Sequence, residues 1–399
     1  MTPARVALIG VHGHGVAHLR TLEALRTAGV ARTVALCDVR PIPADQVPAD
    51  AVGYTDHREM LAGARPDVTI VCTPPHTHLP IALDAARAGS DLLLEKPPVV
   101  ALAEQRVLAQ ALAATGRRCQ VGFQSLGSGA LAALLDAVAA GGLGTLTRIT
   151  ATAAWIRDDA YYARARWAGH RHLDGRVVAD GALTNPFAHA VMNCLAVAAA
   201  ADPGTTPVRV ETELYRCRPI ATDDTSCLRV TTSRGPGFLV AVTLCAEKFA
   251  PPRVVVTGTR GRAVLDYADD RLWLPGDVDP RPVPDRVPLL ANLVAHRADP
   301  AGVPLLAPLA RVAPFTAVLE AVLRSPDPVA VDEAYLRAVP EGGSRRVVLS
   351  GVNDAVEAAG RTGATFSELG AAWAVAGPHA APVDPTATEQ PVDPAAAGH

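Results

Sequence analysis

The first third of the chain alternates short apolar runs with longer alanine-rich segments, and this alternation limits its possible folds more than any other feature. The apolar runs show no polar alternation, which is typical of strands buried on both faces. They lie at 6–9, 34–37, 68–72, 92–94 and 119–123, with helix-length segments between them at 15–28, 56–64, 79–88 and 102–114. Strands and helices that alternate over short connections predict βαβ units around a doubly wound parallel sheet.

After about residue 125 the pattern changes to longer β-branched stretches separated by turn signals. A helix expected at 131–140 is followed by expected strands at 146–155, 208–217, 227–232, 238–244 and 254–256. We expect a second, α+β domain with a mostly antiparallel sheet and with helical regions at 305–323 and 344–359. The fold class is therefore α/β, with predicted domains at 1–124 and 125–375. Residues 376–399 are rich in Pro and Ala without periodicity, and we expect them to be disordered.

The composition excludes several classes of partner. The formal net charge is −3 with both signs interspersed, so the chain offers no basic surface for nucleic acid and no polybasic patch for a membrane. No stretch approaches the ~20 apolar residues of a membrane span. The seven cysteines include no C-x-x-C pair and lie mostly in apolar runs, as reduced and buried thiols do. We expect a cytoplasmic protein whose partners are small molecules or other subunits.

A glycine-rich turn, GVHGHG at 10–15, joins the first expected strand to the first expected helix. In a βαβ unit such a turn lets backbone N–H groups and the helix N-terminus face a pyrophosphate. Asp38 ends the second expected strand, 23 residues after Gly15, where a carboxylate can accept hydrogen bonds from a ribose diol. We predict a dinucleotide site here, and the alternative is a purely structural turn.

His12 stands where the dinucleotide fingerprint has its middle glycine, and Gly13 follows one place later. Either the loop is shifted, or the imidazole itself contacts the cofactor. Asp38 favours NAD over NADP because a carboxylate repels a 2′-phosphate. Arg40 could neutralise that carboxylate or stack on adenine, so we expect NAD as the cofactor with NADP as the alternative.

Histidines gather after the first and third expected strands, at His12, His14, His18, His76 and His78. Both loops lie at the carboxyl edge of a doubly wound sheet, so some of these imidazoles can converge. They could bind a metal ion or form a polar lining of the cofactor cleft. We favour the lining and predict no metal, because no acidic or thiol ligand joins the histidines at a matching spacing.

Seven motifs follow one another along the chain. They are IGVHGHGVAH at 9–18, CDVR at 37–40, CTPPHTH at 72–78, EKPP at 95–98, VGFQ at 121–124, TNPFAHAVMN at 184–193 and GTRG at 258–261. Together they resemble the Gfo/Idh/MocA family of oxidoreductases. The resemblance implies an N-terminal Rossmann domain and a C-terminal open-faced sheet that is commonly used for oligomerisation into dimers or tetramers. It also implies a nicotinamide cofactor between the two domains.

Lys96 in EKPP is one of only two lysines, and lysine, unlike arginine, is a compact charge that can give or take a proton. The resemblance implies that Lys96 points into the cleft and contacts the substrate hydroxyl beside the nicotinamide. We assign the following residues to the cofactor cleft: Gly10, His12, Gly13, His14, Gly15, Asp38, Arg40, Thr73, Pro74, His76, His78, Glu95, Lys96 and Gln124.

The second-domain motif of the family, D-x-x-x-H or N-x-x-x-H, is matched by Asn185 and His189. A spacing of four places both side chains on one face of a helix, aimed at one ligand. His189 is the candidate general base because imidazole titrates near neutral pH, and Asn185 would hold the substrate. Asp180, five residues earlier, is a further candidate for a catalytic carboxylate, and the alternative is a loop or helix-capping aspartate.

The segment 158–176 is dense in Tyr, Arg, Trp and His in a chain with only 4% aromatic residues. Such side chains commonly hold polyhydroxylated substrates. The candidate substrate contacts are therefore Tyr161, Arg164, Arg166 and Trp167, together with Lys96, Asn185 and His189. A solvated or subunit-facing loop is the alternative explanation.

These observations favour an NAD(P)-dependent oxidoreductase that transfers hydride between nicotinamide and a secondary hydroxyl or carbonyl group of a sugar, polyol or cyclitol. His189 would take the hydroxyl proton, and Lys96 would stabilise the developing alkoxide charge. Two alternatives remain open. One is an NAD-dependent glycosidase or epimerase that oxidises its substrate transiently. The other is a non-catalytic nucleotide-binding sensor or assembly subunit, which His12 and Asn185 would fit.

Overall fold

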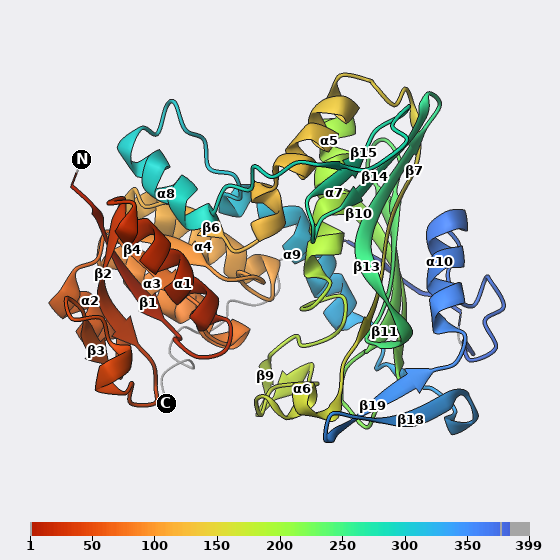
Figure 1. Ribbon diagram of the computed structural model, residues 1–399, viewed down its shortest axis with the longest axis horizontal. Helices are drawn as coiled ribbons and strands as arrows, with labels where there is room; N and C mark the ends of the chain where they lie inside the picture. Colours follow the sequence, from red (N-terminus) through yellow and green to blue (C-terminus); the bar gives the residue numbers. More distant parts are fainter. Residues whose placement is uncertain (1, 376, 384–399) are drawn as a thin grey trace. The chain divides into compact units, whose positions relative to one another are not determined.

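The computed structural model describes residues 2–375 and 377–383 and divides the chain into two compact units (Figure 1). Among the described residues, the first unit contains those up to Gly127 together with Val287–Thr316, and the second contains Ser128–Arg286 and those from Ala317 to Val383. The first junction lies close to the expected boundary at residue 124. The segment 287–316, which we expected in the second domain, belongs to the first unit instead.

A six-stranded sheet forms the centre of the first unit, in the order β3-β2-β1-β4-β5-β6. Its strands are β1 (Ala4–Ile9), β2 (Ala31–Cys37), β3 (Val52–Tyr54), β4 (Val68–Val71), β5 (Asp91–Leu94) and β6 (Cys119–Val121). Every neighbouring pair is parallel, which confirms the predicted doubly wound sheet. The chain changes direction across the sheet between β1 and β4, and ligands bind beyond the carboxyl ends of the strands at such a point.

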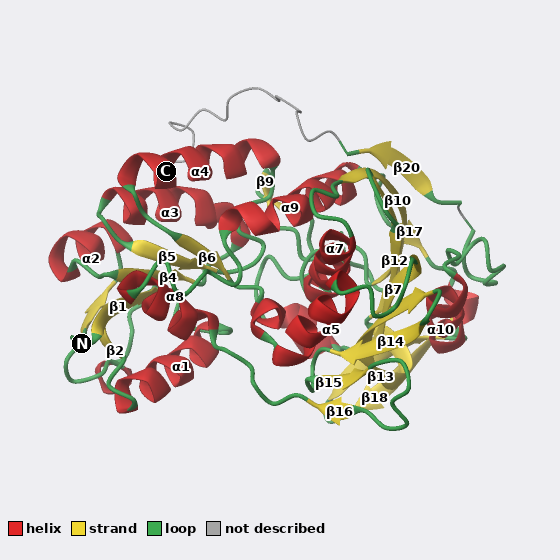
Figure 2. Ribbon diagram, turned by 90° about the horizontal axis from the view of Figure 1, so that it is seen from above, coloured by secondary structure: helices red, strands yellow, loops and turns green. Residues whose placement is uncertain are grey.

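Helices cover both faces of this sheet, with α3 and α4 on one face and α1 on the other (Figure 2). The helices are α1 (Gly15–Thr27), α2 (His57–Ala64), α3 (His78–Arg87), α4 (Leu102–Thr115) and α8 (Leu289–Ala298), with 3-10 turns at Ala44–Gln46, Pro75–Thr77 and Gln124–Gly127. The sequence predicted the first four helices but not α8. Gln120 joins α8 to this unit, because its buried amide donates to the Leu289 carbonyl at 3.2 Å and to Asn292 Oδ1 at 2.6 Å.

A mixed, mostly antiparallel sheet dominates the second unit, in the order β16-β15-β14-β13-β7-β12-β11-β10-β17, with β20 paired to β10. Its strands are β7 (Leu146–Ile156), β10 (Pro207–Arg216), β11 (Thr225–Thr232), β12 (Phe238–Thr243), β13 (Cys245–Gly258), β14 (Gly261–Asp266), β15 (Arg271–Trp273), β16 (Arg281–Pro282), β17 (Val329–Ala330) and β20 (His379–Pro382). Only the pairs of β7 with β12 and of β10 with β17 are parallel among the described strands of this sheet. The predicted sheet type is therefore confirmed.

The remaining elements of the described residues are shorter or lie outside the large sheet. They are α5 (Gly129–Ala139), α6 (Asp159–Ala163), α7 (Ala188–Ala201), α9 (Leu309–Arg324), α10 (Val352–Thr362), β8 (His172–Leu173), β9 (Arg176–Val177), β18 (Leu336–Glu341), β19 (Ser344–Leu349) and a 3-10 turn at Glu333–Tyr335. The boundary between the two units falls within α9.

The large sheet is covered on both faces over its centre, which differs from the open face that we expected. Helix α7 packs on β7, β12 and β13, and α10 packs on the opposite face of the same three strands (Figure 1). Every residue of β12 is consequently buried. Leu239 and Val356 belong to one apolar core with Phe366 and Trp373, so the chain's own C-terminal segment supplies the second cover.

Two expectations for the C-terminal region were wrong. Residues 344–349 form β19 instead of a helix, because Gly342 and Gly343 adopt positive φ angles of 55° and 84° and close a hairpin with β18. Helix α10 begins only at Val352. Within the segment expected to be disordered, β20 pairs with the exposed edge of β10. The rest of that segment, 376 and 384–399, lies outside the described residues. Among the described residues, no helix combines the length and the apolar character that crossing a membrane requires.

Gly10, at the end of β1, should tolerate no side chain. Its φ is 87°, and a Cβ atom there would overlap the carbonyl oxygen of Cys72 after β4. We expect Gly10→Ala to lower the free energy of unfolding by about 2–4 kcal/mol, as backbone strain and a steric clash combine. Urea denaturation measures this loss.

Gly13 provides the matched control, since its φ is 59° but a Cβ atom there would meet nothing within 4 Å. Gly13→Ala should cost only the left-handed backbone penalty of about 1–2 kcal/mol. Equal losses for the two variants would contradict the close approach at Gly10.

Candidate active site

The turn between β1 and α1 is shaped by the close approach of its glycines to neighbouring backbone. A Cβ atom at Gly15 would overlap the carbonyl oxygen of Gly10, while Gly13 borders open space. The N–H groups of Gly15 and Val16 bond back to the carbonyls of His12 and Gly13, at 3.0 and 3.3 Å. The turn therefore runs straight into α1 and leaves room beside Gly13 at the N-terminus of that helix.

Asp38, directly after β2, lies against this turn. Its carboxylate accepts the Val11 N–H at 3.2 Å and the Arg40 N–H at 3.1 Å, and the Arg40 side chain comes within 3.6 Å. His12 Nε2 lies 3.9 Å from the same carboxylate. The His12 side chain therefore points toward Asp38, the residue that we predicted to hold a ribose.

Glu95 is the buried centre of the EKPP region, directly after β5. Its Oε1 lies 2.9 Å from His18 Nε2 and accepts the Gln124 amide at 3.0 Å, and its Oε2 accepts the Lys96 N–H at 3.2 Å. A Cβ atom at Gly122 would lie 2.6 Å from this carboxylate, so only glycine leaves room for it. The network joins α1, β5 and the end of β6, and it holds the backbone of Lys96. The peptide bond from Lys96 to Pro97 is cis.

The electrostatics of this network favour the ionised carboxylate. Burial is the largest effect on Glu95 and by itself would raise its pKa, but the hydrogen bond and charge of His18, with His14 and Lys96, lower the pKa to about 2. Burial is also the largest effect on His14 and lowers its pKa, with His18 and Lys96 acting in the same direction and Glu95 opposing them. Glu95 is therefore a fixed negative charge beside the turn.

His78 does not line the cleft, contrary to its assignment from the sequence. Its side chain is buried, with Nδ1 2.8 Å from the Pro97 carbonyl and Nε2 2.8 Å from the Thr73 carbonyl. The ring thus connects the loop after β4 to the loop after β5. Thr73, Pro74 and the half-buried His76 remain at the carboxyl end of β4, beside the 3-10 turn Pro75–Thr77.

In the second unit, Asp180 is a structural residue rather than the catalytic carboxylate considered from the sequence. Its side chain has no exposed surface and accepts bonds from Arg164 at 2.7 and 2.8 Å, from the Asn185 amide at 2.5 Å and from the Gly169 N–H at 2.8 Å. Both oxygens are therefore committed to the protein. Asp180 positions Arg164 and Asn185 and cannot touch a substrate itself.

Three of the four predicted contacts in the aromatic segment lie together. The guanidinium carbon of Arg164 lies 3.8 Å from the ring centre of Tyr161 and 4.8 Å from that of Trp167, so the cation is flanked by both rings. Arg166 is separate from this cluster, with a side chain that is 82% exposed and 3.6 Å from Asp174.

Asn185 and His189 do not share one helix, because α7 begins at Ala188 with Phe187 as its N-cap. Asn185 lies in the preceding turn, where its N–H donates to the Gly181 carbonyl at 3.0 Å. A Cβ atom at Gly181 would overlap the Asp223 carboxylate, which anchors this turn. His189 is half-buried in the first turn of α7. Asn185 therefore lies in the loop before α7, and His189 lies in the first turn of that helix.

The sequence missed two residues that shape the first unit, His18 as a partner of Glu95 and Gly122 beside its carboxylate. His18 was noted only among the clustered histidines. The available signal for Gly122 was its place in VGFQ, directly after an apolar run, where a glycine indicates close approach of another group.

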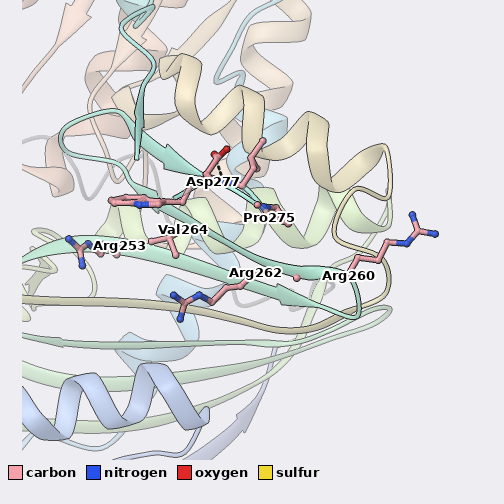
Figure 3. Close-up of a pocket in the computed structure, with 10 residues that line it drawn as sticks. Arg253, Arg260, Arg262, Val264, Pro275 and Asp277 are labelled. Carbon is pink, nitrogen blue, oxygen red and sulfur yellow. Dashed lines mark hydrogen bonds between the residues drawn. The ribbon is translucent and has the colours of Figure 1, made fainter. Parts of the chain in front are cut away.

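A cavity of about 500 Å³ lies in the second unit on β13, β14 and β15 (Figure 3). Its lining includes Arg253, Arg260, Arg262 and Trp273, and none of the predicted site residues. The side chain of Arg253 lies 3.8 Å from Asp266. This cavity therefore lies on the large sheet of the second unit and does not form part of the predicted site.

The cysteines suit the predicted reduced state, since all seven are unpaired and six are buried. Cys217, Asp224 and Cys245 form a buried group with atoms close enough to hold a metal ion. A hydrogen bond to Cys245, together with burial, raises the pKa of Cys217, and burial raises the pKa of Asp224 to about 6. The Asp224 carboxylate already accepts the Cys217 N–H at 2.9 and 3.0 Å, and both thiols belong to the apolar core of the second unit.

Comparison with known proteins finds similarity to one family over residues 4–123. Residues 4–123 match the model of an oxidoreductase family described as having an NAD-binding Rossmann fold. Inositol 2-dehydrogenase 1 of Saccharopolyspora erythraea is 33% identical over 126 residues, which cover 30% of this chain and 36% of that protein. The scyllo-inositol 2-dehydrogenase (NAD(+)) of Bacillus subtilis is 31% identical over 123 residues, or 30% of this chain and 35% of that protein. The chain thus spans about a third of the length of these curated relatives.

Solved structures extend the likeness of the fold to both units. The WlbA dehydrogenase from Bordetella pertussis, solved with NADH and UDP-GlcNAcA, has a TM-score of 0.67 at 22% identity and matches 81% of this chain and 96% of its own. A levoglucosan dehydrogenase, solved with NADH and L-sorbose, has a TM-score of 0.66 at 18% identity, over 82% of this chain and 97% of its own. At these identities the likeness concerns the fold alone.

Replacing Glu95 by Gln should remove a stabilisation that depends on pH. The pKa of this buried carboxyl is about 2 in the folded protein against an ordinary 4.5, so the charged form stabilises the fold above about pH 4.5. We expect Glu95→Gln to cost about 3 kcal/mol of unfolding free energy at pH 7. The difference from the wild type should shrink as the pH falls from 4.5 toward 2.

Urea denaturation of both proteins across this pH range measures the difference. Glu23→Gln, on the exposed face of α1, is the control and should change stability little at any pH. A cost at Glu95 that stays constant from neutral to acid pH would argue against the charged carboxylate.

Asp180→Ala should destabilise the second unit, because it leaves the Arg164 guanidinium without its buried partner. Breaking such a pair costs about 3–5 kcal/mol. Thermal unfolding measures the loss, and Asp174→Ala in the exposed pair with Arg166 should leave the melting temperature unchanged. An Asp180→Ala protein as stable as the wild type would return Asp180 to the list of catalytic candidates.

Proposed function

We propose that this chain belongs to the Gfo/Idh/MocA family of oxidoreductases, whose model matches residues 4–123, and that the whole protein is an NAD-dependent dehydrogenase or reductase. The proposed reaction transfers hydride between nicotinamide and a secondary hydroxyl or carbonyl group of a sugar, polyol or cyclitol. The observation that carries this proposal is the Glu95 network, which holds the Lys96 backbone beside the turn between β1 and α1. In this proposal the Lys96 ammonium faces the substrate at the carboxyl edge of the sheet.

The first unit fits the cofactor at its pyrophosphate and its adenosine ribose. The open space beside Gly13 lies at the N-terminus of α1, where backbone N–H groups attract phosphate oxygens. Asp38 would accept the ribose hydroxyls, and its negative charge disfavours the additional phosphate of NADP. His12 and Arg40 flank that carboxylate and would lie beside the same ribose. Bound nicotinamide supplies the hydride acceptor or donor.

Lys96 and His189 are assigned the two tasks that hydride transfer leaves to the protein. In the oxidation direction, the Lys96 ammonium stabilises negative charge that develops on the substrate oxygen, and His189 accepts the hydroxyl proton. Asn185, oriented by Asp180, would donate or accept a hydrogen bond to another hydroxyl. The cation between Tyr161 and Trp167 offers a further polar group beside apolar rings, a combination suited to sugars.

The substrate class rests on relatives as well as on these side chains. The curated relatives are named inositol 2-dehydrogenases, and two of the similar structures were solved with UDP-GlcNAcA or L-sorbose. All of these molecules carry several hydroxyl groups. We therefore propose a polyhydroxylated substrate for this chain, and a panel of inositols, aldoses, ketoses and nucleotide sugars is the appropriate set to assay.

Lys96→Met tests the proposal, with the other lysine as its control. Removing the ammonium should lower kcat by about 10²–10³, the size expected for loss of one group that stabilises an oxyanion, while the dissociation constant of NAD+ changes less than about threefold. Lys248→Met, on the exposed part of β13, should leave both quantities unchanged. Steady-state formation of NADH and fluorescence titration with NAD+ measure the two quantities.

Two results would point away from this role. A Lys96→Met protein that loses NAD+ affinity in parallel with turnover would make Lys96 a cofactor-binding or structural residue. Wild-type protein that binds NAD+ but turns over no member of the panel would favour the sensor or assembly role instead of the dehydrogenase.

A further inference from the structure

Three potential metal ligands converge at the turn between β1 and α1. His14 is the N-cap of α1, His18 lies four residues later in its first turn, and Glu95 follows β5. The Nε2 atoms of His18 and His14 lie 2.9 and 3.6 Å from Glu95 Oε1, and all three ligand atoms lie within 4.8 Å of one another. The sequence favoured no metal site because no acidic or thiol ligand joins these histidines at a matching spacing, but the fold brings Glu95 to His18 from 77 residues away.

The spacing of these atoms matches one shared ion. Two ligand atoms that each lie about 2.0–2.1 Å from a zinc ion at a tetrahedral angle are about 3.3–3.4 Å apart. The separations of 2.9 and 3.6 Å lie on either side of that value. Small side-chain rotations would therefore complete the geometry without moving the backbone.

His14 makes no competing hydrogen bond to the residues that the structure describes. Its ring makes no hydrogen bond there, since 3.6 Å to Glu95 is too long, and its side chain is 57% exposed. It meets the His18 ring edge to face at 5.4 Å. A solvent-facing imidazole is thus aimed at a buried carboxylate that already has other partners.

The carboxylate is held as metal ligands usually are. The Gln124 amide bonds to Glu95 Oε1, the Lys96 N–H bonds to Oε2, and Gly122 leaves room for the group. Such supporting partners orient a ligand before the ion arrives. Two imidazoles and one carboxylate are a ligand set that suits Zn²⁺ and its close neighbours Co²⁺ and Ni²⁺.

We propose that His14, His18 and Glu95 form a binding site for one divalent transition-metal ion of the Zn²⁺ class. Three protein ligands leave a fourth tetrahedral position on the exposed His14 side for water or a hydroxyl or carboxylate group of a small molecule. On binding, the ion takes the place of the hydrogen between His18 Nε2 and Glu95 Oε1, and His18 binds the ion as a neutral imidazole that carries its one proton on Nδ1. The site does not depend on the proposed dehydrogenase activity, because its ligands bind the ion whether or not hydride transfer occurs.

Metal titration of the full-length protein tests the site. Protein treated with a chelator, without added cofactor, is titrated with Co²⁺ while visible absorption is followed, and with Zn²⁺ by calorimetry. We expect one equivalent to bind, with the intense visible absorption of four-coordinate Co²⁺. His14→Ala should weaken binding at least about 10-fold, the lower limit for loss of even a supporting partner.

His12→Ala is the matched control, because His12 lies two residues away in the same turn but faces Asp38. It should bind both ions as the wild type does. In His14→Cys, a thiolate ligand should add a charge-transfer band of Co²⁺ in the near ultraviolet. Melting temperatures confirm that each variant is folded.

Three outcomes would overturn the proposal. The first is no saturable binding, in which case the three residues form a hydrogen-bonded cluster only. The second is equal affinity in the wild type and His14→Ala, which would place the ion elsewhere, for example on thiols. The third is an equal loss in His12→Ala and His14→Ala, which would indicate a general effect on the turn.

Discussion

The buried carboxylate of Glu95 is the constraint on which the candidate site depends. It joins His18 on α1, Gln124 after β6 and the backbone of Lys96 after β5, so three segments distant in sequence meet at one ionised group. Burying a charge is unfavourable unless every lone pair finds a partner, and here the surrounding donors are sufficient to keep the pKa low. The position of the Lys96 backbone follows from this carboxylate. Glu95 Oε2 accepts the Lys96 N–H, and Oε2 is fixed because Oε1 of the same carboxylate is held by His18 and Gln124.

Asp180 plays the corresponding part in the second unit. It too is a buried acidic side chain whose oxygens are occupied by donors, and among these donors are Arg164 and Asn185, which we propose as substrate contacts. The aromatic rings on either side of Arg164 restrict that cation further. In both units a buried carboxylate, Glu95 or Asp180, fixes the position of a neighbouring polar residue. Leaving either buried charge unpaired would cost free energy, and this cost preserves the arrangement.

Local patterns predicted the elements well where one physical cause decides them. The parallel sheet, the turn GVHGHG and the position of Asp38 follow from apolar runs and from glycine, and each was found as expected. Predictions failed where partners are remote. His78 was taken for a cleft residue, but its ring is bound by the carbonyls of Thr73 and of Pro97, the latter 19 residues away. Residues 344–349 and 379–382 became strands because a hairpin turn and the free edge of β10 were available to them.

The sequence by itself determined the class of each sheet, the nucleotide end of the first unit and the candidate residues at that end, because short-range periodicity and glycine positions are properties of neighbouring residues. Only the tertiary structure decided what those residues contact. It showed that His14 and His18 meet Glu95, that Asp180 is fully occupied by Arg164 and Asn185, and that the chain's own α10 covers the sheet face expected to be open. Burial and hydrogen-bond partners arise between segments far apart in the chain, and no local pattern carries that information.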